Sequence, residues 1–265
     1  MTEAMEQVEK TVCFRKAAWI IAWDAAQGSH VYRRDGDLAF RGDEIVHVGG
    51  RFEGHADVEI DARALMLVPG LINSHFHSTA TMSRKGINQD ACNYLLPAFY
   101  QNVNILQPDM AAKPAVTAFG VGRLLQGGTT TLMDWIAPYD GWIDVLAETG
   151  VRAYVAPFFT SAYWSVHDHG ELRYEWLEDG GRALYEQAVA TMDAAEAHPS
   201  GRLHAMVAPS ELEACSEELL RESRALARQR PDGVSHPRQT RLIQAGDQGG
   251  EYFLLGGGQP GHRSS

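Results

Sequence analysis

The stretch PGLINSHFH, residues 69–77, combines a Pro-Gly turn, a short apolar strand and two histidines two positions apart. Side chains two positions apart on a strand point to the same face, so the rings of His75 and His77 can reach one metal ion while Phe76 turns away into the packing. On their own, two histidines at this spacing are more often ordinary surface or core residues. The apolar strand that precedes them favours a metal site, and imidazole suits zinc, iron, nickel or copper.

Short strands fill the sequence before this stretch. The run Ala17–Trp23 is apolar and rich in aromatic and β-branched residues, which favours a strand. Residues 38–41 and 44–48 flank a Gly-Asp turn and read as two strands joined by it. We therefore expect residues 1–10 to be a flexible tail and residues 11–66 to be a small N-terminal β-sandwich domain.

Strands and helices alternate after this stretch. The expected strands are residues 129–133, 151–159 and 203–208, and the expected helices are residues 111–126, 140–149, 183–195 and 217–228. Repeated β/α units of this size predict a parallel sheet, either doubly wound or a (β/α)8 barrel. Residues 67–229 hold about four such units, so the fold class is α/β.

Composition and charge limit the classes of function. The chain has 265 residues with 23 basic and 34 acidic side chains, a net charge of −11, so it repels phosphate backbones and nucleic-acid binding is not expected. No apolar run reaches the roughly 18 residues of a membrane span, and the acidic start does not read as a secretory signal. Three widely spaced cysteines predict neither a disulfide framework nor a zinc knuckle. These features predict a cytoplasmic protein without a membrane or nucleic-acid partner, and they leave a homo-oligomer open.

The pattern breaks after Gln229. Residues 230–265 are rich in glycine and glutamine and carry few apolar residues, and no period of strand or helix survives in them. This composition predicts an aberrant, mostly disordered tail. His236 and His262 lie within it without a preceding apolar strand, so they read as solvated tail histidines.

Five stretches along the chain resemble the opening half of the amidohydrolase superfamily, in the family's order. They are GDEIVHVG (42–49), VPGLINSHFH (68–77), GGTTTLMD (127–134), VRAYVAPFF (151–159) and LHAMVAPSELEACSEELL (203–220). The resemblance covers about residues 11–229, and Asn73 places it nearer to the cytosine-deaminase, adenosine-analogue-deaminase and triazine-hydrolase branch than to dihydroorotases. It implies an N-terminal β-sandwich, a (β/α)8 barrel, and a catalytic metal held by His75 and His77 at the end of barrel strand 1.

The resemblance also implies the chemistry. In the family, a metal-activated water attacks an electron-poor carbon of a nitrogen heterocycle, and a C–N or C–Cl bond is broken. Two-metal members bridge their ions with a lysine on strand 4, whereas the lysines of this chain stand at positions 10, 16, 85 and 113. One divalent metal is therefore expected, zinc first and iron second, with a small heterocyclic molecule as the substrate.

The rest of the family's ligand set has no match in this sequence. The family takes two further histidines, a Glu and an Asp from strands 5, 6 and 8, so the catalytic Glu and Asp stay unassigned here. Residues 67–229 number 163, against about 250 residues for a full barrel. We therefore expect a barrel that is truncated or frameshifted near Gln229 and inactive on its own. The alternative to an enzyme is a non-catalytic truncated remnant with at most weak metal binding.

Four further residues are candidates for contact with substrate. Trp135, beside Asp134 at the end of the second barrel strand, could stack on a flat heterocycle, or both residues could simply pack. His167 and His169 repeat the two-apart spacing on the face where active-site loops lie, but a solvated loop is the simpler interpretation. Ser210 ends the fourth strand, where it could meet substrate or form a helix capping box with the Glu three residues on.

Overall fold

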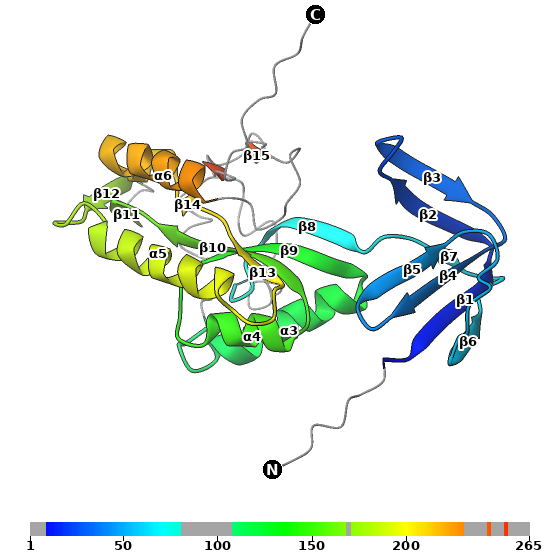
Figure 1. Ribbon diagram of the computed structural model, residues 1–265. Helices are drawn as coiled ribbons and strands as arrows, with labels where there is room; N and C mark the ends of the chain where they lie inside the picture. The colour runs from blue at the N-terminus through cyan, green and yellow to red at the C-terminus, as the bar shows by residue number, and fades with distance from the viewer. Residues whose placement is uncertain (1–8, 81–107, 168–170, 231–242, 245–251, 254–265) are drawn as a thin grey trace, which may run out of the picture. The chain divides into compact units, whose positions relative to one another are not determined.

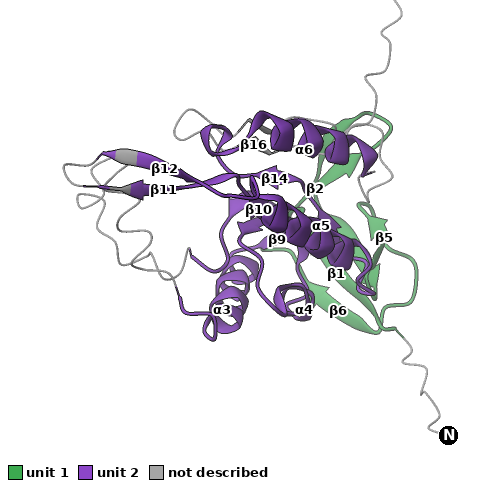
Figure 2. Ribbon diagram, turned by 90° about the vertical axis from the view of Figure 1, so that its left-hand side faces the viewer, with its two compact units in different colours: residues 1–70 green, residues 71–265 purple. Residues whose placement is uncertain are grey.

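The computed structural model describes residues 9–80, 108–167, 171–230, 243–244 and 252–253 (Figure 1). The chain divides into two compact units, residues 1–70 and residues 71–265 (Figure 2). The secondary-structure elements described in the first unit are all strands, whereas strands and helices alternate in the second unit. Within the described ranges, no helix combines the length and the hydropathy that a bilayer crossing requires.

The first unit contains two β-sheets. One sheet has the strand order β5-β4-β1-β6 and the other has the order β3-β2-β7. The strands are β1 (Thr11–Ala17), β2 (Trp19–Asp24), β3 (Ser29–Arg33), β4 (Gly36–Arg41), β5 (Glu44–Val48), β6 (Val58–Asp61) and β7 (Met66–Leu67). The pair of strands predicted at residues 38–41 and 44–48 is confirmed as the antiparallel pair β4 and β5.

β2 shows how the two-residue period of a strand builds the core of this unit. Ile20 is 1% exposed and lies in the buried cluster, whereas Trp23 is 57% exposed and points to the opposite face. Phe14 and Leu38 from one sheet and Leu67 from the other pack against the same cluster. The two sheets therefore share one apolar core, as expected for a small β-sandwich.

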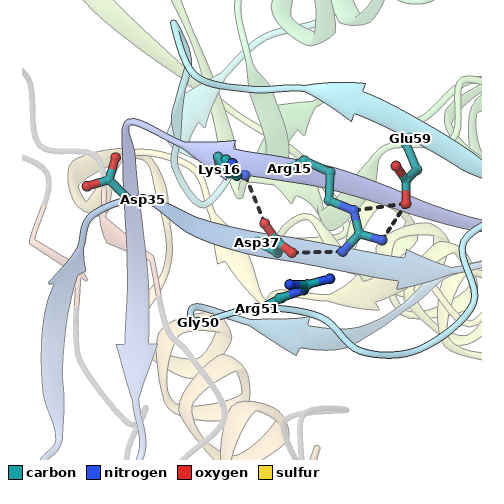
Figure 3. A pocket seen from close by; sticks show the side chains of 7 residues that line it. All are labelled: Arg15, Lys16, Asp35, Asp37, Gly50, Arg51 and Glu59. Carbon is teal, nitrogen blue, oxygen red and sulfur yellow. Dashed lines mark hydrogen bonds and ion pairs between the residues drawn. The ribbon is translucent and has the colours of Figure 1, made fainter.

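A network of ion pairs and hydrogen bonds joins β1, β4 and the loop after β5. Asp37 is 4% exposed and accepts from the N–H groups of Lys16 and Phe52 and from the Arg15 guanidinium, at 2.8, 3.0 and 2.8 Å. Although burial by itself raises the pKa of Asp37, these bonds hold it below its ordinary value. The network lies in an open cavity of about 440 Å³, which is lined by Arg15, Lys16, Asp35, Asp37, Gly50, Arg51 and Glu59 (Figure 3).

The second unit carries a curled sheet of parallel strands. The strands are β8 (Leu71–Phe76), β9 (Thr129–Ile136), β10 (Arg152–Phe159), β13 (Leu203–Ala205) and the short β14 (Ala208–Pro209). Their order is β13-β10-β9-β8, and β14 also pairs with β10. The helices are α3 (Lys113–Gln126), α4 (Trp142–Glu148), α5 (Arg182–Glu196) and α6 (Glu217–Gln229). This arrangement is part of a TIM-type barrel, as the sequence predicts (Figure 1).

Each face of this sheet has its own apolar cluster. On the face toward the helices, Leu132 of β9 packs in a cluster with Val155 and Trp142. On the inner face, Met133 and Trp135 of the same strand pack in a second cluster. Because both faces of β9 are covered, the strand reads as an apolar run rather than as an alternating one.

An antiparallel hairpin follows β10, formed by β11 (Ala162–Val166) and β12 (Leu172–Trp176). Trp164 stands opposite Tyr174 across it, and Ala162 stands opposite Trp176. The aromatic pair of Trp164 and Tyr174 stabilises the hairpin. The polar run that includes His167 masks this pattern, so the sequence predicts only a loop here.

The last described barrel helix, α6, has a different N-cap from the one that the sequence suggests. Ser216 is the N-cap, and its hydroxyl accepts a hydrogen bond from the Leu219 N–H across 3.2 Å. The segment between β14 and Ser216 contains the 3₁₀ turn η3 (Leu212–Ala214). The capping box of Ser210 with Glu213 is therefore wrong, because the helix begins only after this turn.

Most of the tail predicted to be disordered, including His236 and His262, lies outside the described residues. Two short strands within it are described, and they pair antiparallel. They are β15 (Ile243–Gln244) and β16 (Tyr252–Phe253).

Candidate metal centre

His75 and His77 lie at the carboxyl end of β8, and their Nε2 atoms are 2.9 Å apart. The two ring planes are inclined at 82°. Asn73 shapes this end of the strand, because its Oδ1 accepts a hydrogen bond from the His75 N–H across 3.1 Å. Phe76, between the histidines, is 3% exposed and packs in the cluster under the helices. The shared face predicted from the two-residue spacing is thus confirmed.

The second ring nitrogen of His77 fixes which nitrogen can bind a metal. Nδ1 lies 2.6 Å from the carbonyl oxygen of Trp135, which can only accept, so Nδ1 carries the proton and the lone pair is on Nε2. Metal-binding histidines usually donate their other N–H to a carbonyl or a carboxylate in this way. Zinc–nitrogen bonds of about 2.0–2.1 Å can reach both Nε2 atoms from one position. The pair therefore fits a divalent transition metal.

Desolvation favours the neutral, metal-binding form of His75. Its side chain is exposed to solvent on one side, yet the atoms gathered around the ring lower its pKa from the ordinary 6.5. His77 is half-buried. Among the described residues, no third His, Cys, Asp or Glu joins the pair in a cluster that could hold a metal.

Trp135 is brought together with both histidines. Its ring centroid lies 5.0 Å from that of His77 and 6.1 Å from that of His75. The Trp135 ring also packs on Phe158, with the ring centroids 5.7 Å apart, and Trp135 is 5% exposed. The tryptophan ring therefore lies beside the histidine pair, and its stacking on a substrate stays a prediction.

Two of the remaining predicted site residues, Ser210 and His167, have other described partners. Ser210 is 9% exposed; its N–H donates to the Phe159 carbonyl across 2.8 Å, and its own carbonyl accepts from the Cys215 thiol. His167 is exposed beyond β11, with its Nε2 3.1 Å from the Ser165 hydroxyl. His169 lies outside the described residues. Contact of these three with substrate stays a prediction.

Asp134 lies beneath the histidine pair, on the helix side of β9. Its carboxylate accepts from the Ser78 N–H across 2.8 Å and from the Trp142 indole N–H across 2.9 Å. Burial raises its pKa to about 6, although both hydrogen bonds act to lower it. The sequence indicates this buried acceptor only by an acidic residue at the end of an apolar strand. No sequence signal indicates that Ser78 and Trp142 are its donors.

Residues 66–234 match the model of the amidohydrolase family. The chain is 24% identical over 207 residues to the 5'-deoxyadenosine deaminase of Methanosarcina acetivorans, covering 77% of this chain and 44% of that protein. It is 27% identical over 193 residues to the 5-methylthioadenosine/S-adenosylhomocysteine deaminase of Thermococcus kodakarensis, covering 72% of this chain and 42% of that protein. The chain thus spans less than half the length of these curated relatives.

Two solved structures have a similar fold. The atrazine chlorohydrolase of Arthrobacter aurescens TC1, complexed with zinc, has a TM-score of 0.62 at 21% identity, over 82% of this chain and 50% of that chain. The guanine deaminase of C. acetobutylicum with bound guanine has a TM-score of 0.60 at 16% identity, over 82% of this chain and 50% of that chain. At these identities the likeness shows the fold, and it agrees with a partial TIM-type barrel.

Proposed function

Because the chain belongs to the amidohydrolase family, we propose that it is a metal-dependent hydrolase that breaks a C–N or C–Cl bond of a nitrogen heterocycle. The observation that carries the proposal is the pair of Nε2 atoms of His75 and His77, 2.9 Å apart at the carboxyl end of a barrel strand. Active sites of such barrels lie at this end of the strands. The names of the relatives and the fold neighbours, deaminases and a chlorohydrolase, support the type of bond.

The residues of the chain have separate tasks in this proposal. His75 and His77 hold one divalent metal, zinc first and iron second, and the Trp135 carbonyl keeps His77 in the tautomer that binds it. When bound, such an ion supplies a water whose pKa is lowered toward about 7. Residues 203–209, the fourth strand region, contain no lysine that could bridge a second ion.

The surroundings of the pair favour a flat, electron-poor ring as the substrate. The Trp135 ring lies beside the histidines, with its centroid 5.0 Å from that of His77, and the Phe158 ring packs on Trp135 at a centroid distance of 5.7 Å. Aromatic side chains bind planar heterocycles through offset or edge-to-face contacts. We therefore propose a purine-like or triazine-like ring, in line with the deoxyadenosine, methylthioadenosine and atrazine in the names of related proteins.

Metal analysis of the purified full chain tests the proposal. We expect one zinc or iron per chain, lost when His75 or His77 is changed to Ala. His204→Ala is the matched control, because His204 is a partly buried histidine of β13 whose ring packs on Tyr154. Ammonia release from 5'-deoxyadenosine and methylthioadenosine, and chloride release from atrazine, measure turnover. Wild-type protein without bound metal, or metal that survives His75→Ala, would show the proposal to be wrong.

Metal binding without turnover is the second candidate. Two histidine nitrogens supply two of the three protein ligands that a catalytic zinc normally has. Under this candidate the wild-type chain binds metal through His75 and His77, but releases neither ammonia nor chloride from any of the three compounds. The metal analysis and the turnover assay together separate the two candidates.

A further inference from the structure

A closed group of buried polar side chains lies between the histidine pair and the helix layer. Asp134 accepts from the Ser78 N–H and the Trp142 indole, at 2.8 and 2.9 Å. The Ser78 hydroxyl is 3.2 Å from the Thr117 hydroxyl, which accepts from Tyr139 across 2.9 Å. All five side chains are buried, and Asp134, Ser78 and Thr117 are 0% exposed.

This group ties the end of β8 to three other elements. Ser78 follows β8, Asp134 stands on β9, Thr117 is in α3 and Trp142 begins α4. A carboxylate buried this deeply among neutral donors is costly, because desolvation penalises its charged form. Packing alone would be served as well by an apolar residue. The cost therefore indicates a role beyond packing, which depends on the hydrogen bonds that this side chain accepts.

The two ends of β8 and β9 are held together at two neighbouring points. Asp134 accepts from the backbone N–H of Ser78, and the next residue, Trp135, accepts from the ring of His77 across 2.6 Å. The ladder between the strands is irregular here, with a register shift before the pair Phe76 and Asp134. Both the backbone that leaves His77 and its imidazole are thus fixed by consecutive residues of β9.

We propose that Asp134 is a positioning residue for His77. By holding the peptide that follows His77, its carboxylate fixes the backbone from which the imidazole projects, so that Nδ1 meets the Trp135 carbonyl and Nε2 meets Nε2 of His75. The inference deepens the proposed metal function and rests on it for its purpose, although the geometry can be tested without metal. Mutation of residues that support metal ligands typically weakens metal binding about 10–100-fold.

The tautomer of His77 in the metal-free full chain is the first measurement. Two-bond ¹H–¹⁵N correlation spectra report which ring nitrogen carries the proton. We expect the Nδ1–H form in the wild-type chain and a mixture of both forms in Asp134→Ala, which loses the acceptor for the Ser78 N–H. Asp134→Asn keeps one oxygen that can accept this bond, so it should retain more of the Nδ1–H form. An unchanged Nδ1–H form in Asp134→Ala would overturn the inference.

Metal affinity is the second measurement, with cobalt(II) as an optical probe for the wild-type chain and each variant. We expect cobalt to bind at least about tenfold more weakly to Asp134→Ala, with a changed visible spectrum. Ser223→Ala is the control, because Ser223 is 0% exposed and donates to the Leu219 carbonyl within α6. It should lose stability but keep affinity and spectrum. Equal affinity in Asp134→Ala and the wild-type chain would count against the inference.

Two further results keep the inference and the proposed function apart. If the wild-type chain binds no cobalt, the proposed function fails, while the His77 tautomer still decides whether Asp134 positions the ring. If Asp134→Ala does not fold, Trp142→Phe removes one of the two donors to Asp134 and keeps most of the packing. That variant should shift the tautomer and the affinity in the same direction by a smaller factor, and no shift in either would refute the inference.

Discussion

The indole N–H of Trp164 donates to Oε2 of Glu211 across 2.7 Å. Trp164 stands on β11 and Glu211 follows β14, so this bond joins the hairpin to the carboxyl end of the fourth strand region. Glu211 has φ of 47° and ψ of 110°, a conformation that is rare for residues other than glycine. A strained residue thus stands at the end of the sheet where barrel active sites lie.

Changing Trp164 to Phe removes the donor and keeps an aromatic ring opposite Tyr174. A hydrogen bond to a charged group contributes about 1.5–3 kcal/mol, so amides of β11 and β12 should exchange roughly 10–100-fold faster. Native-state hydrogen exchange read by mass spectrometry measures this. Tyr163→Phe, at a side chain 50% exposed on the same strand, is the control and should leave exchange unchanged. Equal protection in both variants would contradict the role of the Glu211 contact.

Asp37→Ala should destabilise the first unit by about 1–3 kcal/mol, because the N–H groups of Lys16 and Phe52 lose their acceptor. Arg15 loses one acceptor but keeps its bonds to Glu59 and to the Phe52 carbonyl. Asp61→Ala is the control. Its ion pair with Arg63 is solvent-exposed, and screening by solvent leaves such pairs with little effect on stability. Urea denaturation of the full chain gives both free energies of unfolding. A loss of similar size in the two variants would show that the Asp37 network is no stronger than a surface pair.

The buried carboxyl of Asp134 should make stability fall as pH rises from about 4 to about 6. Its pKa in the folded chain is raised from 3.8 to about 6, so the folded state binds the proton more tightly than the unfolded state in this window. The group contributes its full stability below pH 4 and has lost roughly 3 kcal/mol of it by pH 7. Asp134→Asn lacks this titration. In metal-free urea denaturation, its free energy of unfolding should therefore increase relative to that of the wild-type chain as pH rises from 4 to 7. A difference that does not change with pH would disprove the raised pKa.

Ser216→Ala should cost about 1 kcal/mol, because it removes the acceptor for the Leu219 N–H at the start of α6. Ser210→Ala separates this N-cap from the capping box that the sequence suggests. We expect a clearly smaller loss in Ser210→Ala, as its hydroxyl does not cap the helix. Thermal unfolding followed by circular dichroism measures both losses of stability. A larger loss of stability in Ser210→Ala than in Ser216→Ala would support the capping box instead.

Elements with local signals are predicted well from the sequence. The helix expected at residues 217–228 is α6, Glu217–Gln229, because its apolar spacing and its acidic first turn lie within the segment itself. His75 and His77 share a face because the period of a strand leaves them no other arrangement. This shared face can be predicted from the local stretch alone, an apolar strand that ends in two histidines.

Features that depend on distant contacts are not predicted. The strand expected at residues 203–208 is split into β13 and β14, and between them the Met206 N–H bonds to the Val155 carbonyl across 2.9 Å. The contact between Ser78 and Asp134 spans 56 positions, and the one between Ser78 and Thr117 spans 39. No periodicity in the sequence records such pairs, because they are chosen by the fold rather than by neighbours along the chain.

The strand that contains His75 and leads into His77 stands at an edge of the described sheet. β8 pairs with β9, and Leu71 and Ile72 at its start are 56% and 74% exposed. An ion bound by His75 and His77 would therefore also stabilise the pairing of this strand with β9. Each tenfold gain in metal affinity would make opening of the strand less favourable by up to about 1.4 kcal/mol, and each loosening of the strand would weaken the ion in return. The same ion would then both activate the water and hold the strand in place.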